Sequence, residues 1–316
     1  MRIVFMGTPD FALPSLQRLI DDGHELAAVY CQPDKPQGRH FILTPPPVKI
    51  LAQRYEIPVE QPATLKSEEA RRRLAGFCPE LIVVAAYGKI LPRAVLELPR
   101  YGCINVHGSL LPRYRGAAPI QWAVINNEPK SGVTIMRMAE GLDTGDMLLV
   151  RETPIGPDET AGELFDRIAV LGAQALSEAV AGFNALVPIP QDDAFACWAR
   201  PLTKSDGEAD WSRAAEEIYA QIRGVSPWPG AYTFLDGKRL KIQKAARCAA
   251  SVPSGCRAGA VFALEDGCPV VACGTGAILL REVQLEGGRR ITGAEFVRGQ
   301  RILPDCSTLL GRNSAD

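Results

Sequence analysis

The stretch Leu81-Ile82-Val83-Val84-Ala85-Ala86 is a run of six apolar residues with no polar interruption. A strand that is apolar on both faces is typical of the middle of a parallel sheet, because helices cover both sides of such a sheet. Shorter apolar runs occur on either side of it, at residues 2–6, 25–31, 101–106 and 133–138. We predict that these runs are strands of the same sheet.

Segments with helical periodicity lie between and after these strands. The apolar residues of 11–20 recur at helical spacing, and 67–75 begins with Ser67 followed by acidic residues, which is typical of a helix N-terminus. Residues 48–55 and the Ala-rich segment 160–186 are further predicted helices. Strands that alternate with helices predict an α/β domain of Rossmann type with a mostly parallel sheet. Ligands of such domains bind beyond the carboxyl ends of the strands.

The chain changes character after residue 188. Residues 189–207 are rich in proline and polar residues, which predicts an extended linker. A predicted helix at 214–223 then precedes five short strands, at 231–235, 239–244, 259–264, 269–273 and 277–283. Short strands of this kind favour a small, OB-like β-barrel. We therefore predict a catalytic domain at 1–188, a linker at 189–207 and a C-terminal domain at 208–316.

Composition excludes several classes of protein. The chain has 316 residues, of which 47% are hydrophobic, as in ordinary globular proteins. No run approaches the ~18 apolar residues that a membrane span needs, and the first strand leaves no room for a signal peptide. The nine cysteines are odd in number and include no C-x-x-C motif, so we expect free thiols and a cytoplasmic location. Their irregular spacing, with no nearby histidine, also argues against a metal site.

Polar residues with catalytic potential lie at the end of the strand at 101–106. Asn105 and His107 are two residues apart, so both side chains point to one face at the end of this strand. Histidine is the natural proton shuttle near neutral pH, and an amide can donate to a developing oxyanion. Asp143, in a Gly-rich loop, can fix the tautomer of a histidine. A lone histidine at a strand end is more often structural, but these neighbours favour catalysis.

No nucleophile stands out near this pair. Ser109 lacks the G-x-S-x-G context of a nucleophile elbow, and Cys103 has the apolar surroundings of a core cysteine. The turn at residues 7–10 lacks the dinucleotide-binding fingerprint as well. An Asn–His–Asp set without a covalent nucleophile suits direct acyl transfer to an amine.

Two basic segments have a structural and a functional interpretation. The Pro-rich loop that starts at residue 32 carries Lys35, Arg39 and Lys49, and it is either a stiffened surface loop or a loop that clamps the substrate. Arg113 and Arg115 follow the strand end, and for them we favour pairing within the fold over contact with a substrate.

Taken together, these residues resemble the methionyl-tRNA formyltransferase family, over nearly the whole chain. The motifs that carry the resemblance are residues 5–12, 32–39, 85–92, 105–120, 142–146 and 227–232. The resemblance implies transfer of the formyl group of 10-formyltetrahydrofolate to the α-amino group of methionyl initiator tRNA, for translation initiation. It also implies a Rossmann-type domain, a linker, a barrel that helps to hold the tRNA, and a monomer.

The resemblance also implies roles for single residues. It gives catalytic roles to Asn105, His107 and Asp143, without a metal, and it places Arg39, with Lys35 in the same loop, near the tRNA. The residues it implies for the folate site are Ser109, Leu110, Leu111, Pro112, Tyr87, Gly88, Lys89, Gly141, Leu142 and Thr144. The chain departs from the family at residues 40–43, where His-Phe-Ile-Leu replaces further lysines, so apolar or stacking contacts are expected in this loop.

Two other functions stay open at this point. Another formyltransferase that uses 10-formyltetrahydrofolate, acting on an amino sugar or a purine precursor, shares the Asn–His–Asp set but explains the linker, Trp228 and Arg39 less well. A noncatalytic tRNA-binding module explains the slightly basic second half of the chain but not the complete catalytic set.

Overall fold

A computed structural model describes residues 1–37 and 41–311 of the chain. It divides into two compact units, which we describe separately. The first comprises residues 1–119, 130–154 and 164–200, and the second comprises residues 120–129, 155–163 and 201–316, as far as these are described. The linker boundaries at residues 188 and 207, which the sequence predicts, are not tested by this division and stay a prediction.

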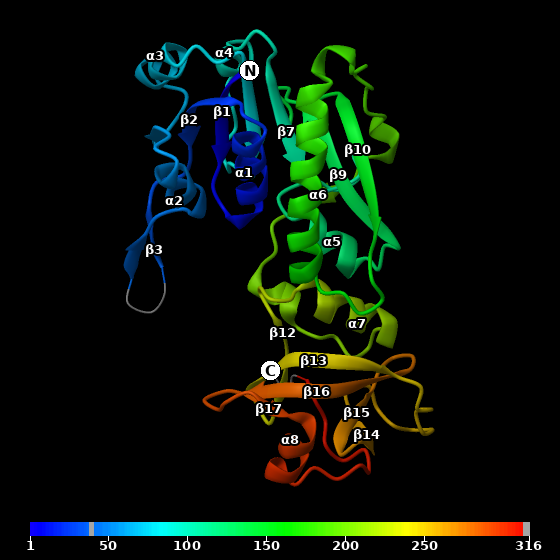
Figure 1. The fold of residues 1–316 in the computed structure, drawn as a ribbon. Coiled ribbons are helices and arrows are strands. Elements are labelled where there is room, and N and C mark those ends of the chain that lie inside the picture. Colours follow the sequence, from blue (N-terminus) through cyan, green and yellow to red (C-terminus); the bar gives the residue numbers. More distant parts are fainter. Residues whose placement is uncertain (38–40, 312–316) are drawn as a thin grey trace. The chain divides into compact units, whose positions relative to one another are not determined.

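A seven-stranded sheet is the centre of the first unit, in the order β10-β9-β7-β6-β1-β2-β5 (Figure 1). Five of its strands are parallel, and β9 runs antiparallel to both β7 and β10. The bounds of the seven strands are β1 Arg2–Gly7, β2 Glu25–Tyr30, β5 Val59–Glu60, β6 Leu81–Ala85, β7 Cys103–His107, β9 Lys130–Arg137 and β10 Met147–Pro154. The predicted α/β fold with a mostly parallel sheet is confirmed.

The middle of this sheet is apolar on both faces, as the sequence predicts. Every residue of β6 is buried, and its neighbour β1 is buried from Ile3 onward. The strand β10 was missed by the sequence analysis, because Arg151 and Glu152 interrupt its apolar pattern and only one of its eight residues is buried.

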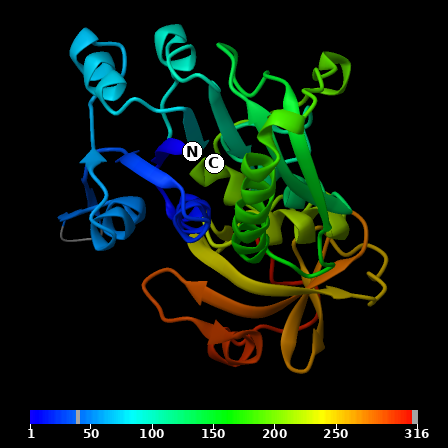
Figure 2. The same cartoon turned by 45° about the horizontal axis from the view of Figure 1, so that its top comes forward.

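Two helices, α1 (Leu13–Asp21) and α6 (Ala161–Ala181), lie side by side over one face of the sheet (Figures 1 and 2). The Arg18 side chain of α1 donates to the Ser177 hydroxyl of α6 at 3.1 Å. Gly172 of α6 faces β7, because a Cβ at this position would lie 2.8 Å from Val106. One prediction differs here in its details: the helix predicted at 160–186 ends at Ala181, and a short 3-10 helix, η2 (Phe183–Ala185), follows it.

Shorter elements complete the first unit. In α3 the Ser67 side chain accepts a hydrogen bond from Ala70 N, which confirms the predicted N-cap. The remaining elements are η1 Asp10–Ala12, β3 Lys35–Gln37, β4 Ile42–Thr44, α2 Pro47–Arg54, α3 Glu68–Gly76, α4 Arg93–Leu96, β8 Arg115–Gly116, η3 Asp193–Phe195 and β11 Trp198–Ala199.

The second unit is built on an antiparallel sheet in the order β12-β13-β16-β15-β14, with β17 paired to β16. This confirms the predicted small β domain. The helix α8 packs on β15 and β16, and Trp211 is buried in the core of the unit, where its indole N–H donates to the Thr233 hydroxyl at 2.9 Å. The bounds are α5 Pro119–Ile125, η4 Lys204–Gly207, α7 Ala215–Gly224, β12 Ala231–Leu235, β13 Lys238–Cys248, β14 Val261–Glu265, β15 Cys268–Ala272, β16 Ala277–Leu285, β17 Ile291–Thr292 and α8 Gly293–Gln300.

The expectation that all nine thiols are free is wrong for one pair. Cys256 and Cys306, which are 50 residues apart in the chain, form a disulfide in the second unit. The other seven cysteines, all within the described residues, are free. The pairing arises because the segment after α8 returns along β14, with Cys306 N donating to Val261 O at 3.0 Å.

Among the described residues, none of the helices combines the length and the apolar character that a membrane span requires.

Candidate active site

The strand β7 places Asn105 and His107 at the carboxyl edge of the sheet. It lies between β6 and β9, with Asn105 opposite Met136 and His107 opposite Thr134 of β9. The two side chains point to the same face, since they are two residues apart on a strand. His107 is buried, whereas Asn105 is only partly buried and, within the described residues, its amide makes no hydrogen bond. The amide is therefore free to contact a substrate.

The ring of His107 lies between two oxygen atoms. Its Nε2 is 3.0 Å from the carbonyl oxygen of Tyr114, and its Nδ1 is 3.6 Å from Oδ2 of Asp143. A carbonyl oxygen can only accept, so Nε2 must carry a proton and donate it to this hydrogen bond. Nδ1 is then the nitrogen that can take up or release a proton, and it faces the carboxylate.

Asp143 is fixed by its loop. It adopts a left-handed backbone conformation with φ of 53°, which Asp tolerates better than most residues. Its Oδ2 also accepts a hydrogen bond from Gly116 N at 2.9 Å. A Cβ at Gly145 would lie 1.9 Å from the carbonyl oxygen of Arg137, so only glycine allows the loop to approach β9 this closely.

The side chain of Gln191 links this loop to a buried arginine. Its amide NH₂ donates to the carbonyl oxygens of Asp143, at 2.9 Å, and of Gly145, at 2.7 Å. Its Oε1 accepts two hydrogen bonds from the guanidinium of Arg115, which also pairs with Asp193 at 2.8 Å. Arg115 is only 4% exposed, so the expected role within the fold is confirmed for this residue.

Gln191 and Asp193 were missed by the sequence analysis, which assigned both to a linker. Nothing in their local sequence indicates a role, because they act on loops that are 46 or more residues away in the chain. Arg113 differs from Arg115: it is exposed, and its guanidinium lies over the Tyr114 ring, 5.3 Å from the centroid.

The loop after β7 is held by buried hydroxyl groups. Ser109 is 1% exposed and donates to the carbonyl oxygen of Arg113 at 2.7 Å. Thr134 of β9, which the sequence analysis did not single out, donates to Ser109 O at 2.7 Å and accepts from Leu111 N at 3.2 Å. The Ser109 hydroxyl thus serves the backbone, which agrees with its rejection as a nucleophile. Leu110 and Pro112 of this loop are partly exposed, and the Leu111–Pro112 peptide is cis.

The predicted folate residues Tyr87, Gly88 and Lys89 follow β6, the neighbour of β7. The carbonyl oxygen of Tyr87 accepts hydrogen bonds from Thr8 and Gln32, each at 3.1 Å. Gly88 has φ of 77° and is exposed.

The ammonium group of Lys89 has backbone partners. It donates to the carbonyl oxygens of Pro62 and Ala63. Partial burial, and then the nearby Lys35, lower its pKa. The structure therefore directs this charge toward the loop after β5 rather than toward His107.

The neighbours of Asp143 in its loop are exposed to solvent. Gly141, Leu142 and Thr144 are exposed, Leu142 by 54%. Lys35 of β3 is also exposed, whereas Arg39 lies outside the described residues.

Two cysteines of the first unit, Cys103 at the start of β7 and Cys31 after β2, are buried as neutral thiols. Burial raises the pKa of Cys103 to about 12 and that of Cys31 to about 11. A thiol is a nucleophile only as the thiolate, so neither has the environment of a catalytic cysteine. Within residues 1–37 and 41–311, no three His, Cys, Asp or Glu side chains gather as they would around a metal ion.

Both units match known proteins. The model of the Formyl transferase family matches residues 1–180, and that of the formyl transferase C-terminal domain matches residues 201–301. The chain is 50% identical over 317 residues to the methionyl-tRNA formyltransferase of Citrifermentans bemidjiense, an alignment that covers 100% of this chain and 98% of that protein. The chain belongs to the methionyl-tRNA formyltransferase family. It is also 50% identical over 311 residues to the family member of Syntrophus aciditrophicus, with 98% of each chain covered.

Solved structures share this fold at low sequence identity. An N-formyltransferase from Helicobacter canadensis, solved with folinic acid and dTDP-3-aminofucose, aligns with a TM-score of 0.67 at 17% identity and covers 89% of this chain and 98% of that one. HypX from Aquifex aeolicus, solved with tetrahydrofolic acid, aligns with a TM-score of 0.63 at 17% identity. This alignment covers 94% of this chain but 47% of HypX, so the chain spans about half of that protein.

Proposed function

We propose that this chain transfers the formyl group of 10-formyltetrahydrofolate to the α-amino group of methionine on initiator tRNA, for translation initiation. One observation carries the proposal: the chain is 50% identical, over its full length, to a methionyl-tRNA formyltransferase. The arrangement of Asn105, His107 and Asp143 supports it, because it offers a base and an oxyanion donor without a covalent nucleophile.

In this mechanism His107 handles the proton. Its Nδ1 takes a proton from the α-ammonium group of methionine, and the resulting amine attacks the formyl carbon. The amide of Asn105 donates to the formyl oxygen as it becomes an oxyanion. The bond between the formyl carbon and the folate N10 then breaks. Of the two protons that the α-ammonium nitrogen has lost, one passes to N10 and the other to solvent, to give formylmethionyl-tRNA and tetrahydrofolate. Asp143 orients His107, and holding the two substrates together supplies much of the rate.

The folate site in this proposal lies at the carboxyl edge of the sheet. It is bordered by Ser109, Leu110, Leu111 and Pro112 after β7, by Tyr87, Gly88 and Lys89 after β6, and by Gly141, Leu142 and Thr144 beside Asp143. What supports the assignment is that ligands of doubly wound sheets bind beyond the carboxyl ends of the strands. Of these side chains, Lys89 has the weakest support, because its ammonium is bound to backbone carbonyl groups.

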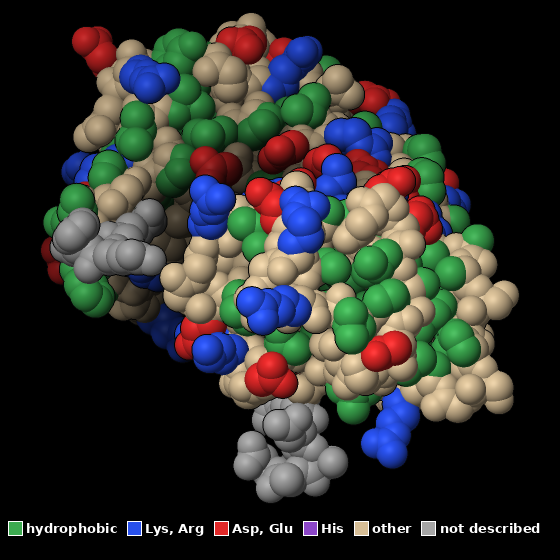
Figure 3. Space-filling view, turned by 90° about the horizontal axis from the view of Figure 1, so that it is seen from below, with side chains coloured by type: hydrophobic (Ala, Val, Ile, Leu, Met, Phe, Trp, Pro, Cys, Tyr) green, Lys and Arg blue, Asp and Glu red, His purple; other side chains and the backbone are tan. Residues whose placement is uncertain are grey.

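We assign tRNA contacts to Lys35 and Arg39 and to the second unit. In the second unit a hollow is lined by Lys204, Arg239 and Lys241 together with Trp228 and Tyr232. Basic and aromatic side chains together suit a nucleic-acid strand, through phosphate contacts and base stacking. Other Lys and Arg side chains are interspersed with acidic ones on the face shown in Figure 3. This hollow is therefore a better candidate for tRNA contacts than the rest of that face.

The test is a direct assay with alternative acceptors. The purified protein is incubated with 10-formyltetrahydrofolate and either methionyl initiator tRNA, uncharged tRNA with free methionine, or a nucleotide-linked amino sugar. We expect formylation of methionyl-tRNA alone. Formylation of the amino sugar in place of methionyl-tRNA would favour a sugar formyltransferase, for which the likeness to the Helicobacter canadensis structure is the supporting observation.

Three further expectations accompany the proposal. The mechanism calls on no metal, so chelation with EDTA should leave the rate unchanged. A monomer is expected, which light scattering can measure. A cytoplasmic location, expected from the thiols, stays a prediction that cell fractionation can check.

A further inference from the structure

Two large aromatic side chains next to the active site are exposed. Phe195 is 69% exposed and Trp198 is 64% exposed, although the segment that carries them is part of the first compact unit. Trp residues are highly buried on average. Two exposed aromatic side chains within four positions are therefore unusual on a surface that binds no partner.

The backbone at Trp198 is tied to the catalytic loops. Trp198 and Ala199 form β11, which pairs in parallel with β8, so that Trp198 lies opposite Arg115 and Ala199 lies opposite Gly116. Arg115 N donates to Cys197 O at 2.9 Å, and Ala117 N donates to Ala199 O at 2.8 Å.

The strand β8 and the residue before it contact two of the three proposed catalytic side chains, those of Asp143 and His107. Gly116 N donates to Asp143 Oδ2 at 2.9 Å, and the carbonyl oxygen of Tyr114, the residue before β8, accepts from His107 at 3.0 Å. Trp198 is therefore one strand away from the backbone that holds His107 and Asp143.

This strand pairing is tightly packed, so it fixes Trp198 relative to the site. Ala199 is fully buried, and a Cβ at Gly116, which has φ of 116°, would lie 2.7 Å from Ala199 O. On the other side of Trp198, the Cys197 sulfur accepts from Tyr114 N at 3.2 Å. The neighbours of Trp198 thus face the protein, while its own ring faces solvent.

We propose that Trp198, together with Phe195, is a stacking platform for the unpaired bases at the acceptor end of the aminoacylated tRNA. The inference rests on the proposed function, in which the reacting amine is joined through one amino acid to the terminal nucleotide. Bases next to the amine must therefore lie close to the site, and aromatic side chains bind unpaired bases by stacking. Asp192 and Asp193 are exposed beside Phe195 and disfavour phosphate, which leaves the ring faces as the contact.

Steady-state kinetics of W198A and W198F test the inference. Loss of stacking on one base should raise the KM for methionyl-tRNA about 5- to 150-fold in W198A and leave the KM for the folate unchanged. W198F keeps an aromatic face and should stay within about threefold of the wild type. The control is V187A, at a side chain that is 76% exposed in the same unit, for which no change is expected.

A fluorescent base reports the contact itself. Methionyl-tRNA with 2-aminopurine at an unpaired position of the acceptor end should change its emission on binding to the wild type, V187A and W198F, and not on binding to W198A. The inference would be overturned if W198A had the same KM for methionyl-tRNA as the wild type and also gave the same change in emission on binding. An equal rise in the KM for the folate, or a lowered unfolding midpoint in both Trp198 variants, would also overturn it, since these indicate a structural role.

Formylation of methionyl-tRNA by the wild-type protein separates this inference from the proposed function. A wild-type protein that does not formylate methionyl-tRNA contradicts the proposed function. A wild-type protein that formylates it, with a W198A variant of equal KM, contradicts the stacking platform alone.

Discussion

The ring of His107 and the carboxylate of Asp143 face each other, with Nδ1 of the histidine 3.6 Å from Oδ2 of the aspartate. The same Oδ2 accepts a hydrogen bond from Gly116 N, and the opposite side of the ring donates to the carbonyl oxygen of Tyr114. Backbone groups of one loop therefore hold both partners. The orientation of the ring and the position of its proton are set by the protein before a substrate binds.

The substitution Asp143→Asn separates the charge of this residue from its structural role. The amide oxygen of Asn can still accept from Gly116 N, but the negative charge that faces His107 is lost. We expect single-turnover formylation to slow about 10²- to 10⁴-fold, the usual contribution of an acid–base pair. Rapid quench measures the rate, and a thermal unfolding midpoint close to that of the wild type is the control. A near-normal rate would show that the carboxylate is dispensable.

Gln191→Ala tests the link between the Asp143 loop and the buried arginine. The substitution removes two hydrogen bonds to the loop and leaves the Arg115 guanidinium without one acceptor. We expect the free energy of unfolding to fall by about 2–4 kcal/mol and turnover to fall with it, because a buried charge loses a partner. Chemical denaturation measures the stability, with V187A as the control. Equal stability of the two variants would contradict the role given to Gln191.

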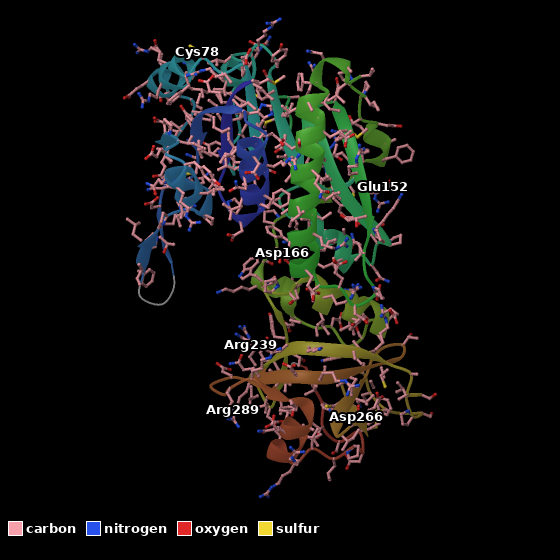
Figure 4. All side chains as sticks on the ribbon, viewed as in Figure 1. Cys78, Glu152, Asp166, Arg239, Asp266 and Arg289 are labelled. Carbon is pink, nitrogen blue, oxygen red and sulfur yellow. A yellow bond between two sulfur atoms is a disulfide. The ribbon has the colours of Figure 1, made fainter. Side chains whose placement is uncertain are left out.

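Alkylation tests whether a cysteine takes part in the reaction. The pKa of Cys103 is raised to about 12 by burial, so at pH 8 the thiol is neutral as well as inaccessible. Cys78 is exposed at the surface of the first unit (Figure 4). We expect iodoacetamide at pH 8 to modify Cys78 and spare Cys103, with formylation retained, as peptide mass spectrometry and the assay can show. Activity that falls in step with modification of Cys103 would speak against a mechanism without a thiol.

Removal of the disulfide tests the correction to the thiol prediction. The bond between Cys256 and Cys306 closes a long loop, and disulfides of this kind stabilise a fold by about 2–4 kcal/mol. We expect Cys306→Ser to lower the thermal unfolding midpoint and to make it insensitive to dithiothreitol. Cys78→Ser, at an exposed free thiol, is the matched control. If the unfolded wild type titrates as nine free thiols without reductant, the disulfide is absent in solution.

Apolar pattern and strand alternation were enough to predict most strands of the sheet and to place Asn105 and His107 at the end of one of them. The run that ends at Ala85 forms β6, and the spacing of Asn105 and His107 places both at the end of β7. These features depend on residues that are close together in the sequence, so the apolar pattern and the residue spacing can predict them.

Features that depend on distant residues could not be predicted. Gln191 and Thr134 act through backbone groups that only the folded chain brings near them. The pairing of Cys256 with Cys306 depends on a chain segment that returns to β14, and an odd number of cysteines gives no hint of it. The strand β10 was missed because its charged residues break the apolar pattern.

Single-turnover formylation by His107→Ala tests most directly whether the arrangement around His107 is the catalytic centre. The enzyme variant, in excess, is mixed with 10-formyltetrahydrofolate and methionyl initiator tRNA, and product is followed by rapid quench. We expect a rate about 10²- to 10⁴-fold below that of the wild type, with folate binding and the unfolding midpoint unchanged. A rate close to that of the wild type, with folate binding intact, would contradict the proposed role of His107.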